Sequence, residues 1–269
     1  MRHYATLAGL ATLLALSTPL QAAGAQAARA PMLLRYRFVA GQTLTYRLAL
    51  TDTEQQTLSG KVTRNKQTFT ALAHYQFRTV AKDGKAHLVI HLTQQARTTS
   101  SGGKPHPATP PVPDVDTQQW PDGTQVNSAS LTRGGYGAGD IGILSDVPVG
   151  VGSHWSSSLD KQPGLNQTLH CTNTVSALRS TRAGLVATIV VEGAFTGVGQ
   201  SDQINGHFRG TTHERLQSTW QFNATSGRFV SGEGRYTIVE TGTLTVGTKA
   251  HPVRTLVSYQ FAMKPVGAQ

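Results

Sequence analysis

The stretch Leu33–Leu50, LLRYRFVAGQTLTYRLAL, decides the fold class of this 269-residue chain. Apolar and polar residues alternate on both sides of Ala40-Gly41-Gln42. The apolar positions are Leu34, Tyr36 and Phe38 before this triplet, and Leu44, Tyr46, Leu48 and Leu50 after it. Because successive side chains of a strand point to opposite faces, the pattern predicts two short strands joined by a turn. The intervening arginines, Arg35, Arg37 and Arg47, make the opposite face basic.

The same alternation returns along most of the chain. Gln67–Val80 and the run Leu88–Leu92 flank Lys82–Lys85, whose Asp-Gly pair is typical of a tight hairpin turn. Thr51–Arg64 is polar and predicts an exposed or edge strand that is broken at Gly60. Further strands are expected at Gln167–Leu178, Leu185–Phe195, Glu214–Phe222, Phe229–Val239, Gly242–Val246 and Val253–Met263, with a hairpin loop at Asn223–Gly227. Outside the first 27 residues, no window keeps a 3.6-residue apolar period, so little helix is expected.

These elements predict an all-β fold, a long antiparallel meander. It is expected to curl into an open or partial barrel, or to form two packed sheets. Residues 28–97 form the N-terminal β part and residues 120–269 the C-terminal β part, packed together as one domain. Residues 98–119, which are rich in Pro, Gly and Ser, are expected to be a linker or loop. A faint echo between the runs after Gly41 and Gly152 leaves open a chain built from two similar halves.

The first 27 residues have the layout of a secretory signal peptide. A short basic start precedes the apolar run Ala5–Leu16, and small-residue patterns predict cleavage after Ala22 or Ala27. The apolar run is too short to span a bilayer, and no later stretch approaches that length. The sequence therefore predicts a periplasmic or secreted protein with no transmembrane segment after cleavage.

The chain is basic but weakly charged. Its formal net charge is +10, and charged residues make up 14% of it. The Lys and Arg residues are scattered and form no basic run, so a generally basic surface is expected and no binding to nucleic acid. The single cysteine, Cys171, forms no internal disulfide and is expected to be a small buried hydrophobe.

Four patterns bear on known chemistries. Gly137–Gly142 matches G-x-G-x-x-G but lacks the strand before it and the helix after it that dinucleotide binding requires. His213-Glu214 lacks the second His of a zinc helix and lies in a strand pattern, and His87 and His91 are too far apart along a strand to share a metal. His74 facing one of them across the hairpin leaves open a surface metal pair. No nucleophile elbow is present. No catalytic residue, cofactor or metal ligand is therefore assigned.

The aromatic residues are the candidates for ligand contact. A curled sheet with these side chains inside would offer an apolar ligand an interior of the kind found in small barrels. In the alternative interpretation they simply fill the core. The residues are Tyr36, Phe38, Tyr46, Phe69, Tyr75, Phe77 and Trp155.

Three spaced motifs carry a family resemblance. They are Leu34-x-Tyr36-x-Phe38-x-x-Gly41-x-x-Leu44-x-Tyr46, Pro148-x-x-x-Gly152-x-x-Trp155 and Phe222-x-x-x-x-Gly227-x-Phe229. In these motifs the chain resembles a family of uncharacterised secreted bacterial β-sheet proteins, a domain of unknown function, over most of residues 33–263. The Ala-rich signal segment fits a bacterial periplasmic origin. The resemblance transfers no catalytic residue, because such families carry no established activity.

Three functions remain open. The first is a non-enzymatic protein that binds a hydrophobic or amphipathic molecule or an anionic envelope component, since basic residues such as Arg35, Arg37, Arg47 and Arg78 suit anionic lipid headgroups. The second is an envelope scaffold or protein-interaction module that uses exposed strand edges. The third is an unrecognised hydrolase. The sequence leaves the oligomeric state open.

Overall fold

The computed structural model describes residues 30–99, 114–126, 144–159, 169–203 and 206–267. The described part of the chain contains strands, turns and extended segments, and no helix. The eleven strands are β1 (Thr43–Leu58), β2 (Lys61–Val80), β3 (Ala86–Thr99), β4 (Val115–Gln119), β5 (Gln125–Val126), β6 (His154–Leu159), β7 (Leu169–Thr181), β8 (Gly184–Gln203), β9 (Gly206–Asn223), β10 (Arg228–Val246) and β11 (Lys249–Pro265). The predicted all-β fold is confirmed.

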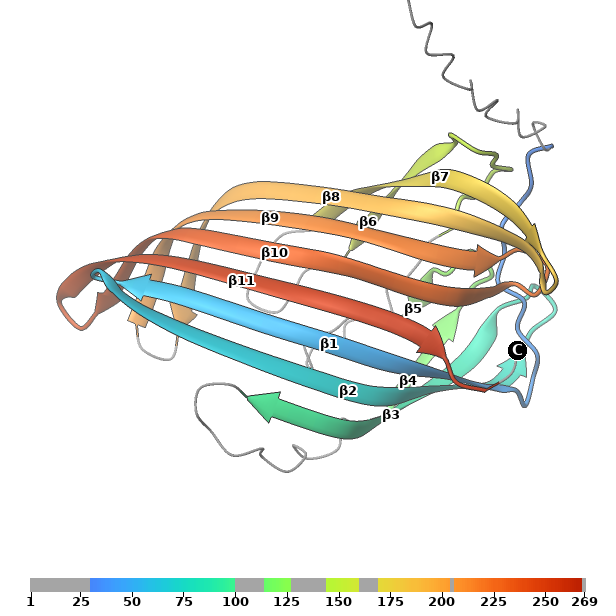
Figure 1. The fold of residues 1–269 in the computed structure, drawn as a ribbon, viewed down its shortest axis with the longest axis horizontal. Helices are drawn as coiled ribbons and strands as arrows, with labels where there is room; N and C mark the ends of the chain where they lie inside the picture. The colour runs from blue at the N-terminus through green and yellow to red at the C-terminus, as the bar shows by residue number, and fades with distance from the viewer. Residues whose placement is uncertain (1–29, 100–113, 127–143, 160–168, 204–205, 268–269) are drawn as a thin grey trace, which may run out of the picture.

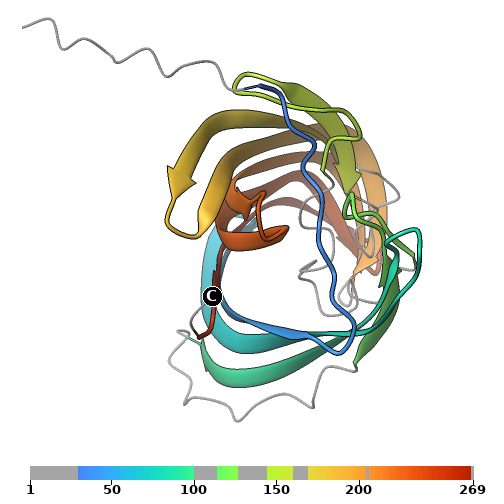
Figure 2. The same ribbon diagram turned by 90° about the vertical axis from the view of Figure 1, so that its right-hand side faces the viewer.

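All eleven strands belong to one antiparallel sheet with the order β5-β4-β3-β2-β1-β11-β10-β9-β8-β7-β6. Every neighbour follows in sequence except at the centre, where the first strand pairs with the last, for example Leu48 with Met263. The sheet is not closed, because its two edges are β5 and β6. It curls strongly around a central space (Figures 1 and 2). The open or partial barrel is confirmed, and the alternative of two packed sheets is wrong.

Strict alternation decides which face of each strand carries the core. On β9, the residues between the buried positions are mostly exposed, and the terminal Asn223 is buried as well. The buried residues that share one face are Phe208, Thr212, Glu214, Leu216, Ser218, Trp220 and Phe222. The register continues this face across the sheet, since Phe222 lies opposite Ala187 of β8 and Phe229 of β10. We call the face that carries Phe222 the inner face, and the opposite one the outer face.

The main core lies at one end of the inner face. There the side chains of Leu34, Tyr46, Trp220, Phe222 and Phe229 form one buried cluster. The extended segment 30–42 crosses this end of the curled sheet (Figure 2). Because Leu34 is completely buried in the cluster, this segment is part of the core and not a loose terminus.

The first half of the deciding stretch is not a strand, which corrects the prediction for Leu33–Phe38. Its backbone is tied to three separate loops instead of to a ladder. Met32 forms a bridge with Val149, the Tyr36 amide donates to the carbonyl of Pro121, and the Arg37 amide donates to that of Gly227. The alternation still holds, because Leu34 and Tyr36 face the core. The predicted turn at Gly41 is confirmed, with a positive φ of 77°.

Thr51–Arg64 also differs from the prediction of an exposed or edge strand. Residues up to Leu58 continue β1, which lies between β2 and β11 at the centre of the sheet. The expected break is a two-residue turn at Ser59-Gly60, after which β2 begins. The polar sequence is misleading because every second residue, such as Asp52, points to the inner face beyond the core, where polar side chains are accommodated.

The predicted hairpins fit the structure closely. The turn at Lys82–Lys85 joins β2 to β3, and the loop Asn223–Gly227 joins β9 to β10. Both ends of the linker or loop predicted at residues 98–119 belong to strands. β3 reaches Thr99, and β4 begins at Val115 and pairs with β3, while residues 100–113 lie outside the described residues.

Candidate ligand-binding site

Five of the seven predicted ligand-contact residues line one pocket at the core end of the inner face. They are Tyr36, Phe38, Tyr46, Tyr75 and Phe77. The rings pack against each other, with centroid distances of 5.0 Å for Phe38–Phe77 and 5.5 Å for Tyr46–Tyr75. The free volume is only about 50 Å³. A space of this size holds a water molecule or two, so these side chains largely fill the core at this end.

The tyrosines of this pocket are held in their neutral form. Burial raises the pKa of Tyr46 to about 12, against a smaller opposing effect of Arg228. Burial also raises the pKa of Tyr36 and Tyr75. The Tyr46 hydroxyl donates a hydrogen bond of 3.3 Å to the carbonyl oxygen of Phe229. The pocket is therefore mostly apolar with uncharged tyrosines, although Arg37 and Arg228 also line it.

The other two predicted residues lie outside this pocket. Trp155 of β6 is half-buried and packs against the edge of the main core. Phe69 of β2 is half-buried further along the inner face, opposite Leu50 of β1 in the register. The seven residues therefore share the interior of the sheet but do not form one site.

Beyond the aromatic pocket, the inner face carries a strip of apolar side chains that are only half-buried. We call it the inner strip. It consists of Leu48, Leu50, Phe69, Val191, Phe195, Ile238, Val257 and Phe261. The strands supply these residues in register, for example Leu50 opposite both Phe69 and Phe261. Half-buried apolar surface arranged in one strip is the kind of surface on which a ligand gains binding energy by excluding water.

Four carboxylates lie on the same face, and two of them are direct neighbours of the inner strip, since Glu54 lies opposite Val257 and Glu214 opposite Ile238. Asp52 and Glu54 come from β1, Glu214 from β9 and Glu240 from β10. Glu214 is only 7% exposed and accepts a hydrogen bond from the Tyr236 hydroxyl. One carboxylate oxygen of Asp52 is buried and has no hydrogen-bond partner among the described residues. The inner face is thus apolar at the core end, whereas carboxylates and apolar side chains are mixed further along.

Burial and mutual repulsion disfavour the charged form of two of these acids. Burial raises the pKa of Asp52, and the nearby Glu54 raises it further. Burial raises the pKa of Glu240, with smaller contributions from Glu214 and Glu54. A positively charged group placed among them would relieve both effects. Sequence reasoning missed these acids, although the alternation from Phe208 to Phe222 already places Glu214 on the apolar side of its strand.

Basic residues of the central strands alternate onto the opposite face. Arg47 of β1, Arg215 of β9 and Arg235 of β10 are all exposed on the outer face. A groove of about 670 Å³ also crosses the outer face over β8, β9, β10, β11 and β1. Its lining includes Glu192, Glu233 and Arg235, so it carries both charges. The inner face of these strands is therefore acidic, whereas the outer face carries groups of both signs.

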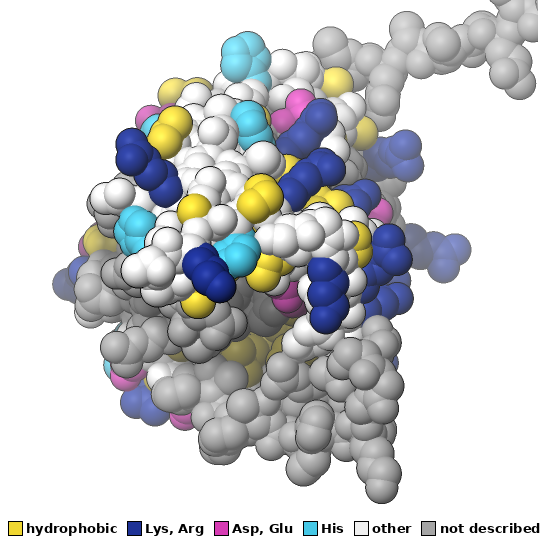
Figure 3. All heavy atoms as spheres, turned by 90° about the vertical axis from the view of Figure 1, so that its left-hand side faces the viewer, with side chains coloured by type: hydrophobic (Ala, Val, Ile, Leu, Met, Phe, Trp, Pro, Cys, Tyr) yellow, Lys and Arg dark blue, Asp and Glu magenta, His cyan; other side chains and the backbone are white. Residues whose placement is uncertain are grey.

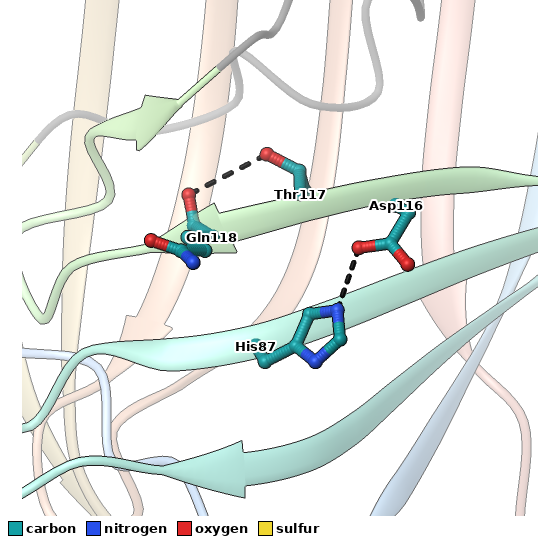
Figure 4. Close-up of polar contacts among 4 residues, drawn as sticks. All are labelled: His87, Asp116, Thr117 and Gln118. Carbon is teal, nitrogen blue, oxygen red and sulfur yellow. Dashed lines mark hydrogen bonds and ion pairs between the residues drawn. The ribbon is translucent and has the colours of Figure 1, made fainter.

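Two His–Asp pairs lie where β4 joins β3. His87 Nε2 is 2.6 Å from Asp116 Oδ1, and the two side chains face each other across the strands (Figure 4). His91 Nδ1 is 2.5 Å from Asp114 Oδ1. Each pair joins an imidazole to a carboxylate, whereas a hydrolase triad also requires a nucleophilic hydroxyl beside the imidazole. The pairs link the strands on the exposed face.

The other histidines singled out in the sequence, His74 and His213, also form hydrogen bonds with side chains of neighbouring strands. His74 lies opposite His91, with ring centroids 6.2 Å apart, and its Nδ1 is 3.1 Å from the Thr45 hydroxyl. His213 is exposed and bonds Thr196, whereas the adjacent Glu214 points to the inner face. Within the described residues, no three His, Cys, Asp or Glu side chains are grouped so that they could hold a metal ion. Gly137–Gly142 lies outside the described residues.

Cys171 of β7 is buried, and we expect its thiol to be unreactive. It is 3% exposed, and burial raises its pKa to about 11. Since the thiolate is the reactive form, alkylation by iodoacetamide at pH 8 should be at least about 100-fold slower than in the unfolded chain. Mass spectrometry over time measures both rates, with the protein in urea as the control. Equal rates in the folded and unfolded protein would contradict the buried position.

No protein-family model matches the sequence, and no curated protein matches it. Among the described residues, none forms a helix long and apolar enough to cross a membrane.

Proposed function

We propose that the protein is a non-enzymatic binding protein that acts in the periplasm or after secretion. Its ligand is a hydrophobic or amphipathic molecule that lies along the inner face of the sheet. The observation that carries the proposal is the inner strip, a set of half-buried apolar side chains on the inner face of an open sheet.

Part of the inner strip lies outside the packed core, so its residues are available for a ligand. The core end is packed around a free volume of about 50 Å³, which leaves no room for a ligand. Phe69 and Val257, in contrast, belong to none of the buried clusters and stay partly exposed to solvent. A hydrocarbon chain placed along these residues would cover surface that the fold leaves open.

The carboxylates of the inner face favour an amphipathic ligand over a purely hydrophobic one. Asp52, Glu54 and Glu240 accept hydrogen bonds and attract positive charge. The headgroup that fits beside them therefore carries N–H donors or a positive charge.

Variants of the inner strip test the proposal. In native mass spectrometry of the mature protein from its own compartment, we expect a bound amphiphile that solvent extraction releases. Replacing both Phe69 and Val257 with alanine should weaken binding of dodecyltrimethylammonium, below its micelle concentration, by at least about tenfold in calorimetry. Leu72→Ala is the matched control, because Leu72 is half-buried on the outer face of β2, the strand that carries Phe69.

The effect of the headgroup charge on affinity gives a second comparison. Dodecyl sulfate has the same chain but a negative head, so we expect it to bind more weakly than the cation. A protein that carries no amphiphile and binds neither probe would contradict the proposal. Equal losses in the inner-strip and Leu72→Ala variants would place the ligand elsewhere.

A strand edge supports the second candidate, an interaction module. Ala194–Gln203 of β8 pairs with β9 on one side, whereas β7 pairs with β8 only as far as Gly193. Within the described residues, nothing pairs with the other side of this segment, so a partner's strand could be added there. A pull-down that depends on Val198, which is 75% exposed on this segment, would support this function over ligand binding.

A further inference from the structure

Three hairpins meet at the end of the sheet that lies away from the main core (Figure 1, left). They are the turns between β1 and β2, between β8 and β9, and between β10 and β11. We call the described residues 55–66, 206–213 and 241–256 together the hairpin end. Residues 204–205 lie outside the described residues.

The surface of the hairpin end is basic. Its six Lys and Arg residues are all exposed: Lys61, Arg64, Lys66, Arg209, Lys249 and Arg254. Its three spans contain no Asp or Glu. The adjoining carboxylates of Glu54, Glu214 and Glu240 belong to the inner face. Lys and Arg side chains gather along one side of this end, as Figure 3 shows.

Among the side chains that the structure describes, none of these basic groups forms an ion pair with a carboxylate; the side chain of Asp202 on β8 is not among them. The ion pairs among the described residues are His87–Asp116 and His91–Asp114, both far from the hairpin end in the sheet. Arg64 donates a hydrogen bond to the Gln55 side chain, which is neutral. The positive charge of the three spans is therefore not neutralised by an ion pair among the described side chains.

Exposed apolar side chains lie among the basic ones. Val62 is 47% exposed on the β1–β2 hairpin and Val246 is 43% exposed on the β10–β11 hairpin. Hydrophobic side chains are visible between the Lys and Arg groups in Figure 3. Apolar side chains that lie beside Lys and Arg are suited to enter the lipid headgroup region when such a surface docks on a membrane.

We infer that the hairpin end is a docking surface for an anionic lipid bilayer. Lys and Arg contact the phosphate groups of the lipids, while Val62 and Val246 enter the headgroup region. Nucleic acid fits less well, because single strands require aromatic stacking platforms and Phe208, the aromatic residue of this end, is buried. The inference is independent of the inner-face ligand, because the inner strip and the basic surface share no residue.

Charge reversal at the two ends of the sheet tests the inference. Lys61→Glu, Arg209→Glu and Lys249→Glu are combined in one variant of the mature chain. Lys82→Glu, Arg182→Glu and Lys264→Glu form the matched control, with the same change in net charge at exposed positions toward the opposite end. Co-sedimentation with vesicles of phosphatidylcholine and phosphatidylglycerol measures binding, and pure phosphatidylcholine vesicles provide the neutral reference.

Each basic group near a membrane contributes about fivefold in affinity, so the hairpin-end variant should bind the anionic vesicles at least about 100-fold more weakly. The control variant should lose much less, and added salt should weaken wild-type binding. Val62→Ser with Val246→Ser should lower affinity without changing the salt dependence. Circular dichroism checks that all variants are folded.

Three results would overturn the inference. Wild-type protein could fail to bind anionic vesicles, or the two triple variants could lose affinity equally, which would make the attraction a property of the whole basic chain. A short DNA duplex could also displace the vesicles at matched phosphate concentration, which would assign the surface to nucleic acid. The Phe69 and Val257 variant should bind vesicles like wild type, so failure of the ligand proposal is recognised separately.

Discussion

Replacing Phe222 with alanine is expected to lower the free energy of unfolding by about 4 kcal/mol. Phe222 is completely buried, and its ring meets those of Tyr36 and Phe229 at centroid distances of 5.4 Å each. The three rings come from β9, β10 and the segment before β1, so they tie the N-terminal segment to the sheet. Alanine would leave a cavity where the Phe222 ring lies. Because the neighbouring rings are fixed by their own contacts, this cavity cannot collapse fully.

Thermal unfolding followed by circular dichroism measures this loss. For a chain of this size, the melting temperature should fall by on the order of 10 °C. Val198→Ala on β8 is the control, because Val198 is 75% exposed and its truncation should change stability by less than about 0.5 kcal/mol. A melting temperature of Phe222→Ala equal to that of wild type would mean that the N-terminal segment does not pack on this end of the sheet.

Replacing Gly232 with alanine should cost about 3 kcal/mol, although only one methyl group is added. A Cβ atom at Gly232 would overlap two ring carbons of Trp220. The indole has little freedom to move, because its ring centroid lies 5.3 Å from that of Phe229 and 5.7 Å from that of Phe261. Its Nε1 also donates a hydrogen bond to the Ser218 hydroxyl. The added methyl group therefore displaces a ring from the centre of the core.

Gly199 supplies the matched control for this substitution. It is also a strand glycine, but a Cβ atom there meets no other atom within 4 Å. Gly199→Ala should leave stability unchanged or raise it slightly, because alanine lowers the entropy of the unfolded chain. Urea titration distinguishes the two variants. Trp220→Leu in the Gly232→Ala background should recover part of the loss, and additive effects would argue against the contact.

Alternation predicts most of this fold from sequence because the strands are long and their inner faces are apolar near the core. Phe69, Tyr75 and Phe77 on β2, and the hairpin at Asp83-Gly84, follow directly from the two-residue period. The period also places Leu34 and Tyr36 inside. It could not show that their segment is no strand, because side-chain direction is the same in an extended segment whose hydrogen bonds go to loops.

The acidic part of the inner face escaped prediction for a different reason. A polar stretch of sequence predicts side chains that are exposed to solvent, and Asp52 and Glu54 lie in a stretch with few apolar neighbours. Their side belongs to the interior because β11 pairs with β1, which is a contact between residues about 200 positions apart that no local pattern encodes. The size of the pocket at the aromatic end also depends on how the rings interlock, and residue types alone do not determine it.

The pairing of β1 with β11 also fixes the order in which the molecule can be completed. During synthesis, β1 is made about 200 residues before β11, yet one of its two ladders requires that strand. Contacts between such distant parts of a chain carry a large loop-closure cost and form slowly. The centre of the sheet therefore closes only after β11 has been made, which keeps the earlier strands in an incomplete sheet until then.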